Sequence, residues 1–212
     1  MTPPVHAAGM ASASDPAIAH IDGLVSTYGF AVVSVGYGPC SEPGCDHGPG
    51  PHPWAYTVGL MAQMQPELVV MGSTIQEASE MVHAVVDMRR DDLALRHADE
   101  FWAVGVPVML CVEDVPDPWV QYDPARMSAW FAWNRGRYGT VPVVQQVLWT
   151  DGDGAFPFDE DCDPWTVADQ PVLSLDPFAF PEPANRATRR AARREIGRQF
   201  PSPPPPWGPR AA

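Results

Sequence analysis

Apolar residues recur every three or four positions in three stretches of the chain, the spacing of one face of an α-helix. The first stretch begins at Asp15-Pro16 and ends at Gly29, and the second follows Thr74 and Glu77, which are spaced as a capping box. The third begins at Asp123-Pro124 and ends near Gly136 or Gly139. The buried faces are expected to hold Ile18, Ile21 and Val25, then Ala78, Met81, Val82, Val85 and Val86, then Met127, Trp130 and Phe131.

Runs of apolar and β-branched residues between these helices predict at least five strands. They cover residues 30–35, 55–60, 67–72, 106–114 and 143–150, and the last runs into Asp-Gly-Asp-Gly, which is typical of a hairpin turn. Several strands follow one another directly. This order indicates an α+β domain, with a mixed, mostly antiparallel sheet packed by about three helices.

Proline-rich segments divide the chain into parts. We expect a flexible arm over residues 1–14, a globular domain over 15–176 that contains a Pro/Gly loop at 38–53, and a disordered Pro/Arg-rich tail over 177–212. No apolar run approaches the roughly 18 residues that a membrane span needs, and the N-terminus lacks the features of a secretory signal. With only four cysteines, the sequence favours a reduced, cytoplasmic protein with no membrane contact.

Every one of the 13 basic side chains is arginine, and the chain has no lysine. This composition excludes the lysine-dependent P-loop, protein-kinase and Schiff-base chemistries. The bias toward arginine, alanine and proline favours a GC-rich genome, that of a bacterium or its phage.

Charge is divided unevenly along the chain. Seven arginines and two glutamates give residues 181–212 a charge of +5, while six arginines and 24 acidic residues give the remainder −18. On a helix, five tail arginines share one face: Arg186, Arg189, Arg190, Arg193 and Arg194. An anionic partner is expected for them, with three alternatives: nucleic-acid phosphates, an acidic protein surface, or the chain's own acidic body. A purely solubilising tail is the other interpretation.

Several short motifs, in their order and spacing, resemble the domain of unknown function 4262 family of bacteria and phages. They are Tyr28-Gly29-Phe30, Tyr56-Thr57-Val58-Gly59-Leu60, Pro66-Glu67-Leu68, Tyr138-Gly139, Gln146 with Trp149 and Asp151, Phe156-Pro157, and Gln170-Pro171-Val172-Leu173. The resemblance covers roughly residues 18–175. The chain departs from it at Met64-Gln65, Thr150 and Phe158. It implies no activity, because the family has none assigned.

The family-like polar and aromatic positions on or beside the strands are the candidate pocket residues: Tyr56, Thr57, Glu67, Gln146, Trp149 and Asp151. A polar side chain buried in a sheet must bond a neighbour or face a cleft. The two interpretations are therefore structural pairing and a small-ligand pocket, with Glu67 or Asp151 as the acid–base candidate in the second.

Cys40, Cys45, His47 and His52 lie within thirteen residues and are of the types that bind zinc. Their spacing matches no common finger, and the surrounding prolines and glycines favour a surface loop. The turn at 151–156 lacks an oxygen ligand where a calcium loop needs one, because Ala155 and Phe156 stand there. No nucleophile or dinucleotide motif is present.

The function favoured by these patterns is that of a binding protein, regulatory or accessory, with an arginine-rich tail that contacts an anionic partner. The alternative is a small-ligand- or flavin-dependent enzyme with a split-barrel-like fold, by analogy of strand order alone. No cofactor is predicted, and flavin and zinc stay open as alternatives.

Overall fold

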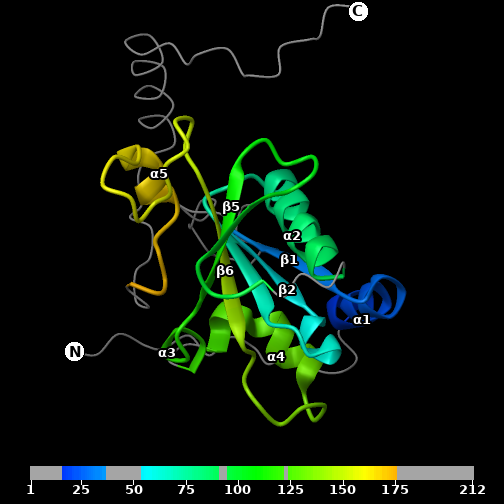
Figure 1. Ribbon diagram of the computed structural model, residues 1–212. Helices are drawn as coiled ribbons and strands as arrows, with labels where there is room; N and C mark the ends of the chain where they lie inside the picture. Colours follow the sequence, from blue (N-terminus) through cyan, green and yellow to red (C-terminus); the bar gives the residue numbers. More distant parts are fainter. Residues whose placement is uncertain (1–15, 37–53, 91–94, 122–123, 176–212) are drawn as a thin grey trace, which may run out of the picture.

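The computed structural model describes residues 16–36, 54–90, 95–121 and 124–175 (Figure 1). The N-terminal arm, the Pro/Gly loop with Cys40, Cys45, His47 and His52, and the C-terminal tail with its arginines lie outside the described residues. The same holds for Asp15 and Asp123, which the sequence places at the starts of two helices.

Six strands form one mixed sheet in the order β1-β2-β3-β6-β5-β4. Their bounds are β1 (Ala31–Val35), β2 (Trp54–Val58), β3 (Glu67–Met71), β4 (Asp99–Trp102), β5 (Met109–Asp114) and β6 (Val144–Trp149). β3 and β6 run parallel, and the other four neighbouring pairs are antiparallel. The α+β class and the mostly antiparallel sheet are therefore confirmed.

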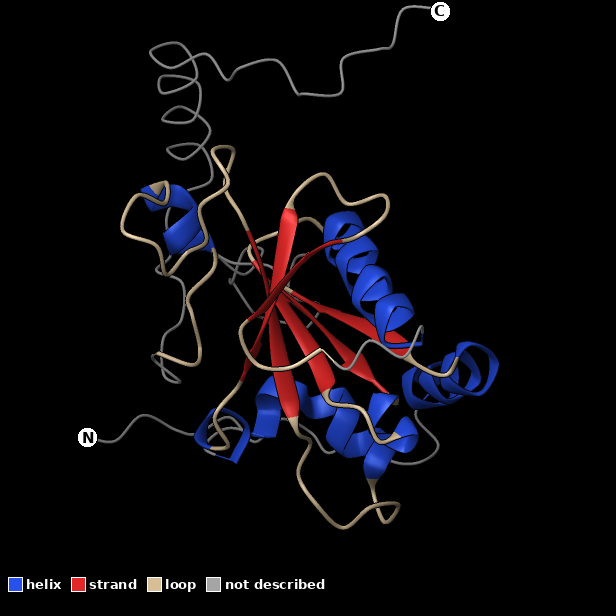
Figure 2. Ribbon diagram, in the orientation of Figure 1, coloured by secondary structure: helices blue, strands red, loops and turns tan. Residues whose placement is uncertain are grey.

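Helices cover both faces of this sheet (Figure 2). α2 (Ile75–Arg90) packs on one face, while α1 (Pro16–Tyr28), α3 (Pro118–Gln121) and α4 (Ser128–Asn134) pack on the other. There are two short 3₁₀ turns: η1 (Leu60–Gln63) follows β2, and η2 (Pro124–Met127) precedes α4. α5 (Pro164–Asp169) lies beyond the end of β6.

The core is split by the sheet into two clusters, because successive strand residues point to opposite faces. Leu68 and Val70 of β3 pack toward α2, whereas Val69 and Met71 pack toward the tryptophans of α3 and α4. β2 and β3 are buried on both faces, which accounts for their nearly continuous apolar sequence.

The predicted features of α2 are confirmed in detail. The Thr74 amide donates to Glu77 Oε2 at 2.8 Å, and the Glu77 amide donates to Thr74 Oγ1 at 3.2 Å, as a capping box requires. The five apolar residues expected on its inner face are its buried residues.

Three expectations about the elements need correction. β4 was not predicted: it is an edge strand in which exposed and partly buried residues alternate, so it lacks a strong apolar pattern. The turn after β6 is not a hairpin, because the chain continues into α5 and β6 pairs with β3 and β5. Ile18 and Val25 of the first helix and Phe131 of the third pack against the core but are only partly buried.

The described strands also do not form a split barrel. β1 and β4 are the two edges of the sheet, so the order is open. Among the described residues, no helix has the length and apolar character to cross a membrane.

Candidate functional site

Glu67 is the most heavily hydrogen-bonded side chain of the predicted site. Its carboxylate is fully buried at the start of β3 and accepts five hydrogen bonds. Oε1 accepts from the Gly59 amide at 3.0 Å, the Met61 amide at 3.2 Å and Trp130 Nε1 at 3.0 Å. Oε2 accepts from Thr57 Oγ1 at 2.6 Å and the Leu60 amide at 3.3 Å.

The sequence Thr57-Val58-Gly59-Leu60 explains how the backbone reaches this carboxylate. The first amides of a helical turn have no partner within the turn, and η1 aims those of Leu60 and Met61 at Glu67. Gly59 adopts φ 118°, and a Cβ there would lie 3.0 Å from Val25 and 3.1 Å from the Gly29 carbonyl oxygen. Glycine is therefore required where β2 turns toward the carboxylate.

Burial governs the titration of this cluster. Burial raises the pKa of Glu67, and the hydrogen bonds from Thr57, the turn amides and Trp130 oppose that shift. Burial also raises the pKa of Tyr56 to about 12, although its hydroxyl accepts a hydrogen bond from the Ala129 amide at 3.0 Å. Both side chains join the sheet to α4, and neither lines the pocket described below.

Gln146 and Gln170 link β6 to the segment that begins at the end of α5, because the side chain of each bonds the backbone of the other segment. We call the bonds made by Gln170 the Gln170 clamp. Gln146 Nε2 donates to the Pro171 carbonyl at 2.8 Å, and its Oε1 accepts from the Leu173 amide at 2.9 Å. In the opposite direction, Gln170 Oε1 accepts from the Trp149 amide at 3.0 Å and its Nε2 donates to the Trp149 carbonyl at 3.1 Å. Each glutamine thus satisfies backbone groups that a neighbouring strand would otherwise pair.

Asp151 organises the turn after β6. Its side chain accepts hydrogen bonds from the amides of Asp153 at 2.9 Å, Ala155 at 3.0 Å and Asp163 at 2.8 Å. Burial acts to raise the pKa of this carboxyl, but the hydrogen bonds from the three amides and from the Cys162 side chain together outweigh it, and the pKa is lowered. A carboxylate held ionised in this way fixes the loop that leads to α5.

Arg89 was missed by the sequence reasoning and anchors α2 to the sheet. It donates to the Pro66 carbonyl at 3.2 Å and to Gln145 Oε1, and Gln145 Nε2 donates to Asp114 Oδ1 at 2.7 Å. Burial lowers the pKa of Arg89 to about 10, so the guanidinium stays charged at neutral pH. The alternation along β6 could have indicated that Gln145 faces α2.

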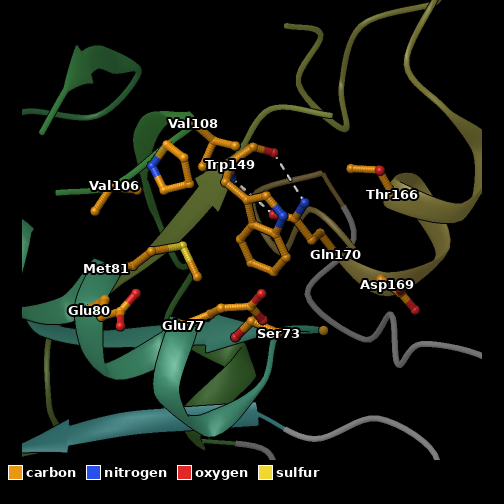
Figure 3. Close-up of a pocket in the computed structure, with 12 residues that line it drawn as sticks. Ser73, Glu77, Glu80, Met81, Val106, Val108, Trp149, Thr166, Asp169 and Gln170 are labelled. Carbon is orange, nitrogen blue, oxygen red and sulfur yellow. Dashed lines mark hydrogen bonds between the residues drawn. The ribbon is translucent and has the colours of Figure 1, made fainter. Parts of the chain in front are cut away.

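A pocket of about 230 Å³ lies at the other end of β6, around Trp149 (Figure 3). The Trp149 side chain stands between α2 and the Gln170 clamp, with the dashed hydrogen bonds of Figure 3 holding its backbone. The lining comes from the β3–α2 loop, α2, the loop before β5, the end of β6 and α5: Gly72, Ser73, Glu77, Glu80, Met81, Val106, Pro107, Val108, Trp149, Thr166, Asp169 and Gln170. We call this cavity the Trp149 pocket.

The walls of the Trp149 pocket are packed directly against each other. Gly72 adopts φ +78°, and a Cβ there would lie 2.2 Å from the carbonyl oxygen of Asp169. Only glycine lets the β3–α2 loop approach α5 so closely. The pocket therefore rests on fixed backbone contacts as well as on side chains.

The predicted site residues fall into separate places. Tyr56, Thr57 and Glu67 come together beneath α4. Gln146 bonds the segment after α5, and Asp151 bonds the turn that follows β6. Of the predicted site residues, only Trp149 lines the pocket. Tyr56 and Glu67 share the face of the sheet that Gln146 also occupies, but α4 and the segment at 171–173 fill that face.

The other pocket residues were not predicted as a site. Glu77, Glu80 and Met81 are close together on α2 by helical spacing, yet nothing local in the sequence says that this side of the helix meets β6. In the part of the chain that the structure describes, no three His, Cys, Asp or Glu side chains gather as a metal site.

Comparison with known proteins gives one finding. The model of the family described as Domain of unknown function (DUF4262) matches residues 24–163. No curated protein and no solved structure matches the chain. The family match covers the sheet, α2 and α4, including the Gly59 turn and Glu67, and on this evidence the chain belongs to the DUF4262 family.

Proposed function

We propose that this protein acts by binding, as a regulatory or accessory protein, and that the Trp149 pocket is its ligand site. The observation that supports the proposal is the pocket itself: an aromatic wall and several polar groups gathered from five separate segments. Binding sites for small molecules are typically concave and partly apolar, with a few placed polar groups. A volume of about 230 Å³ is below the roughly 300–1,000 Å³ of pockets that hold drug-sized ligands, so the pocket suits a smaller molecule.

The bonding of the two acid–base candidates favours binding over catalysis. Glu67 is fully buried beneath α4 and both of its oxygens accept hydrogen bonds, so neither oxygen is exposed to a substrate in this arrangement. Asp151 is committed to three backbone amides and has a lowered pKa. A general acid or base needs a reachable atom and a pKa near the working pH.

The arginine-rich tail supplies a second contact in this proposal. Arg186, Arg189, Arg190, Arg193 and Arg194 carry the charge for it, and the partner is anionic. A ligand pocket on the body and a charged tail together fit a protein that reports the presence of a ligand to a partner.

The test uses the indole N–H resonances of the isotope-labelled full chain, with Trp149→Phe used to assign the Trp149 signal. A library of fragments with at most ten non-hydrogen atoms is added, and we expect a subset to shift the Trp149 resonance. The affinity of these fragments, measured from the relaxation of their own resonances, should fall at least fivefold in Trp149→Phe. Trp165→Phe, which changes a tryptophan outside the pocket lining, is the matched control. A library that leaves the Trp149 resonance unmoved would overturn the proposal.

A further inference from the structure

The charged residues in the described lining of the Trp149 pocket are all acidic. Three of its lining residues are carboxylates, Glu77, Glu80 and Asp169, and none of the twelve is basic. The described lining thus contains no arginine or histidine. Glu77 and Glu80 attract a cation that enters the pocket and repel an anion.

Two of these carboxylates keep an oxygen for a ligand. Glu77 uses Oε2 to accept the Thr74 amide, and Glu80 uses Oε1 to accept from Gln76 Nε2 at 2.9 Å. The second oxygen of each accepts no hydrogen bond from the described residues. A donor-rich ligand could therefore bind without breaking the capping box at the start of α2.

The remaining walls favour a cation with an apolar stem. Trp149 offers the aromatic face that binds cations best among side chains, and Met81, Val106 and Val108 add apolar surface. In the described residues, the carboxylates do not gather into a metal-binding group. An organic cation fits this combination better than a bare divalent ion, which needs converging oxygens.

We infer that the Trp149 pocket, taken as the binding site proposed above, takes a guanidinium or alkylammonium group on a short apolar stem. Two sources offer this chemistry: a free small molecule, and an arginine of the chain's own tail. Arg186 lies 11 residues beyond Leu175, a length that spans up to roughly 36 Å when extended. A tethered arginine also has an effective concentration in the millimolar range.

The test compares butylguanidinium with butylurea, an uncharged compound of nearly the same shape, on the full chain at low ionic strength. We expect butylguanidinium to shift the Trp149 indole resonance with an affinity at least tenfold higher than butylurea. In the Glu77→Gln/Glu80→Gln variant the ratio should fall below about threefold, because glutamine keeps the capping box but removes both charges. Glu160→Gln, an exposed acid outside the pocket, should leave the ratio unchanged.

A second arm identifies the source. The five arginines at 186, 189, 190, 193 and 194 are changed to glutamine in the full chain. If the tail occupies the pocket, butylguanidinium binds this variant at least threefold more tightly than the wild type; equal affinities assign the pocket to an outside ligand.

Equal binding of butylurea and butylguanidinium, or tighter binding of an anion such as pentanoate, would overturn the inference and leave the pocket a ligand site of another class. Absence of any Trp149 response to any fragment would overturn the proposed function as well.

Discussion

The core of this domain tolerates buried polar side chains because their donors and acceptors have hydrogen-bond partners. Glu67 accepts five donors without an ionic partner among them, and Thr57 both donates to it and accepts from the Leu68 amide at 2.8 Å. A buried carboxylate is tolerated when each lone pair is met, and it becomes costly when a partner is lost. The motif Tyr56–Leu60 with Pro66–Leu68 is thus a structural signature of how β2 meets β3.

Substitution of Glu67 by glutamine tests this role. The amide nitrogen cannot accept, so at least one of the five donors is left without an acceptor, at a cost of about 1–3 kcal/mol in the free energy of unfolding. Urea unfolding near pH 4 measures the loss. The exposed Glu160→Gln is the control and should change the free energy of unfolding by less than about 0.5 kcal/mol.

The pH dependence of that loss follows from the raised pKa of Glu67. The folded chain holds this proton more tightly than the unfolded chain does, so the contribution of Glu67 is full below the unfolded pKa and is lost as the pH rises through the folded pKa. The advantage of the wild type over Glu67→Gln should therefore shrink between pH 4 and pH 8. An advantage that grows over this range would show that the folded pKa is lowered instead.

The position of α5 beside the Trp149 pocket depends on two contacts, one at Gly72 and one at Gln170. Gly72 lets the β3–α2 loop touch the Asp169 carbonyl, and Gln170 ties the end of α5 to the end of β6. The position of α5, and with it the shape of the pocket, depends on both contacts.

Gly72→Ala is expected to displace α5. The new methyl group would lie 2.2 Å from the Asp169 carbonyl oxygen at a positive φ, and we expect a destabilisation of more than about 2 kcal/mol together with a shifted Trp149 indole resonance. Gly152→Ala is the matched control, because a Cβ at Gly152 meets nothing within 4 Å. A Gly72→Ala protein with unchanged stability and resonance would refute this role of the contact.

Local patterns predicted the elements well, and pairing over long separations explains what they missed. The capping box and the buried face of α2 depend on residues a few positions apart, so the sequence contains their whole signal. The parallel pairing of β3 with β6 joins residues such as Val69 and Gln146, and no local pattern encodes it. That pairing brings Trp149 beside α2, which is why the sequence indicated Trp149 but not its pocket.

Charge is distributed unevenly over the whole molecule: residues 1–180, here called the body, carry −18, and residues 181–212 carry +5. The acidic Trp149 pocket belongs to the body, and the five clustered arginines belong to the tail. The body should repel nucleic acid, so any affinity for phosphates must come from the tail. Deletion of the tail should therefore remove the contact with the anionic partner and leave ligand binding in the Trp149 pocket.

Binding of the tail to duplex DNA should weaken steeply as the salt concentration rises. If four or five arginines contact phosphates, counterion release gives a slope near −4 for log affinity against log salt concentration. Binding should not depend on base sequence, because the five arginines share one face without aromatic residues between them. Fluorescence anisotropy with labelled duplexes of different sequence measures the salt slope and the dependence on base sequence. Deletion of residues 181–212 should abolish binding while the body keeps its melting temperature at high salt.

If the tail instead docks on the acidic body, deletion lowers the melting temperature at low salt and neither protein binds DNA. An intact protein without salt-dependent DNA binding at low ionic strength would exclude the phosphate contact and leave an acidic protein surface or the chain's own body as the partner.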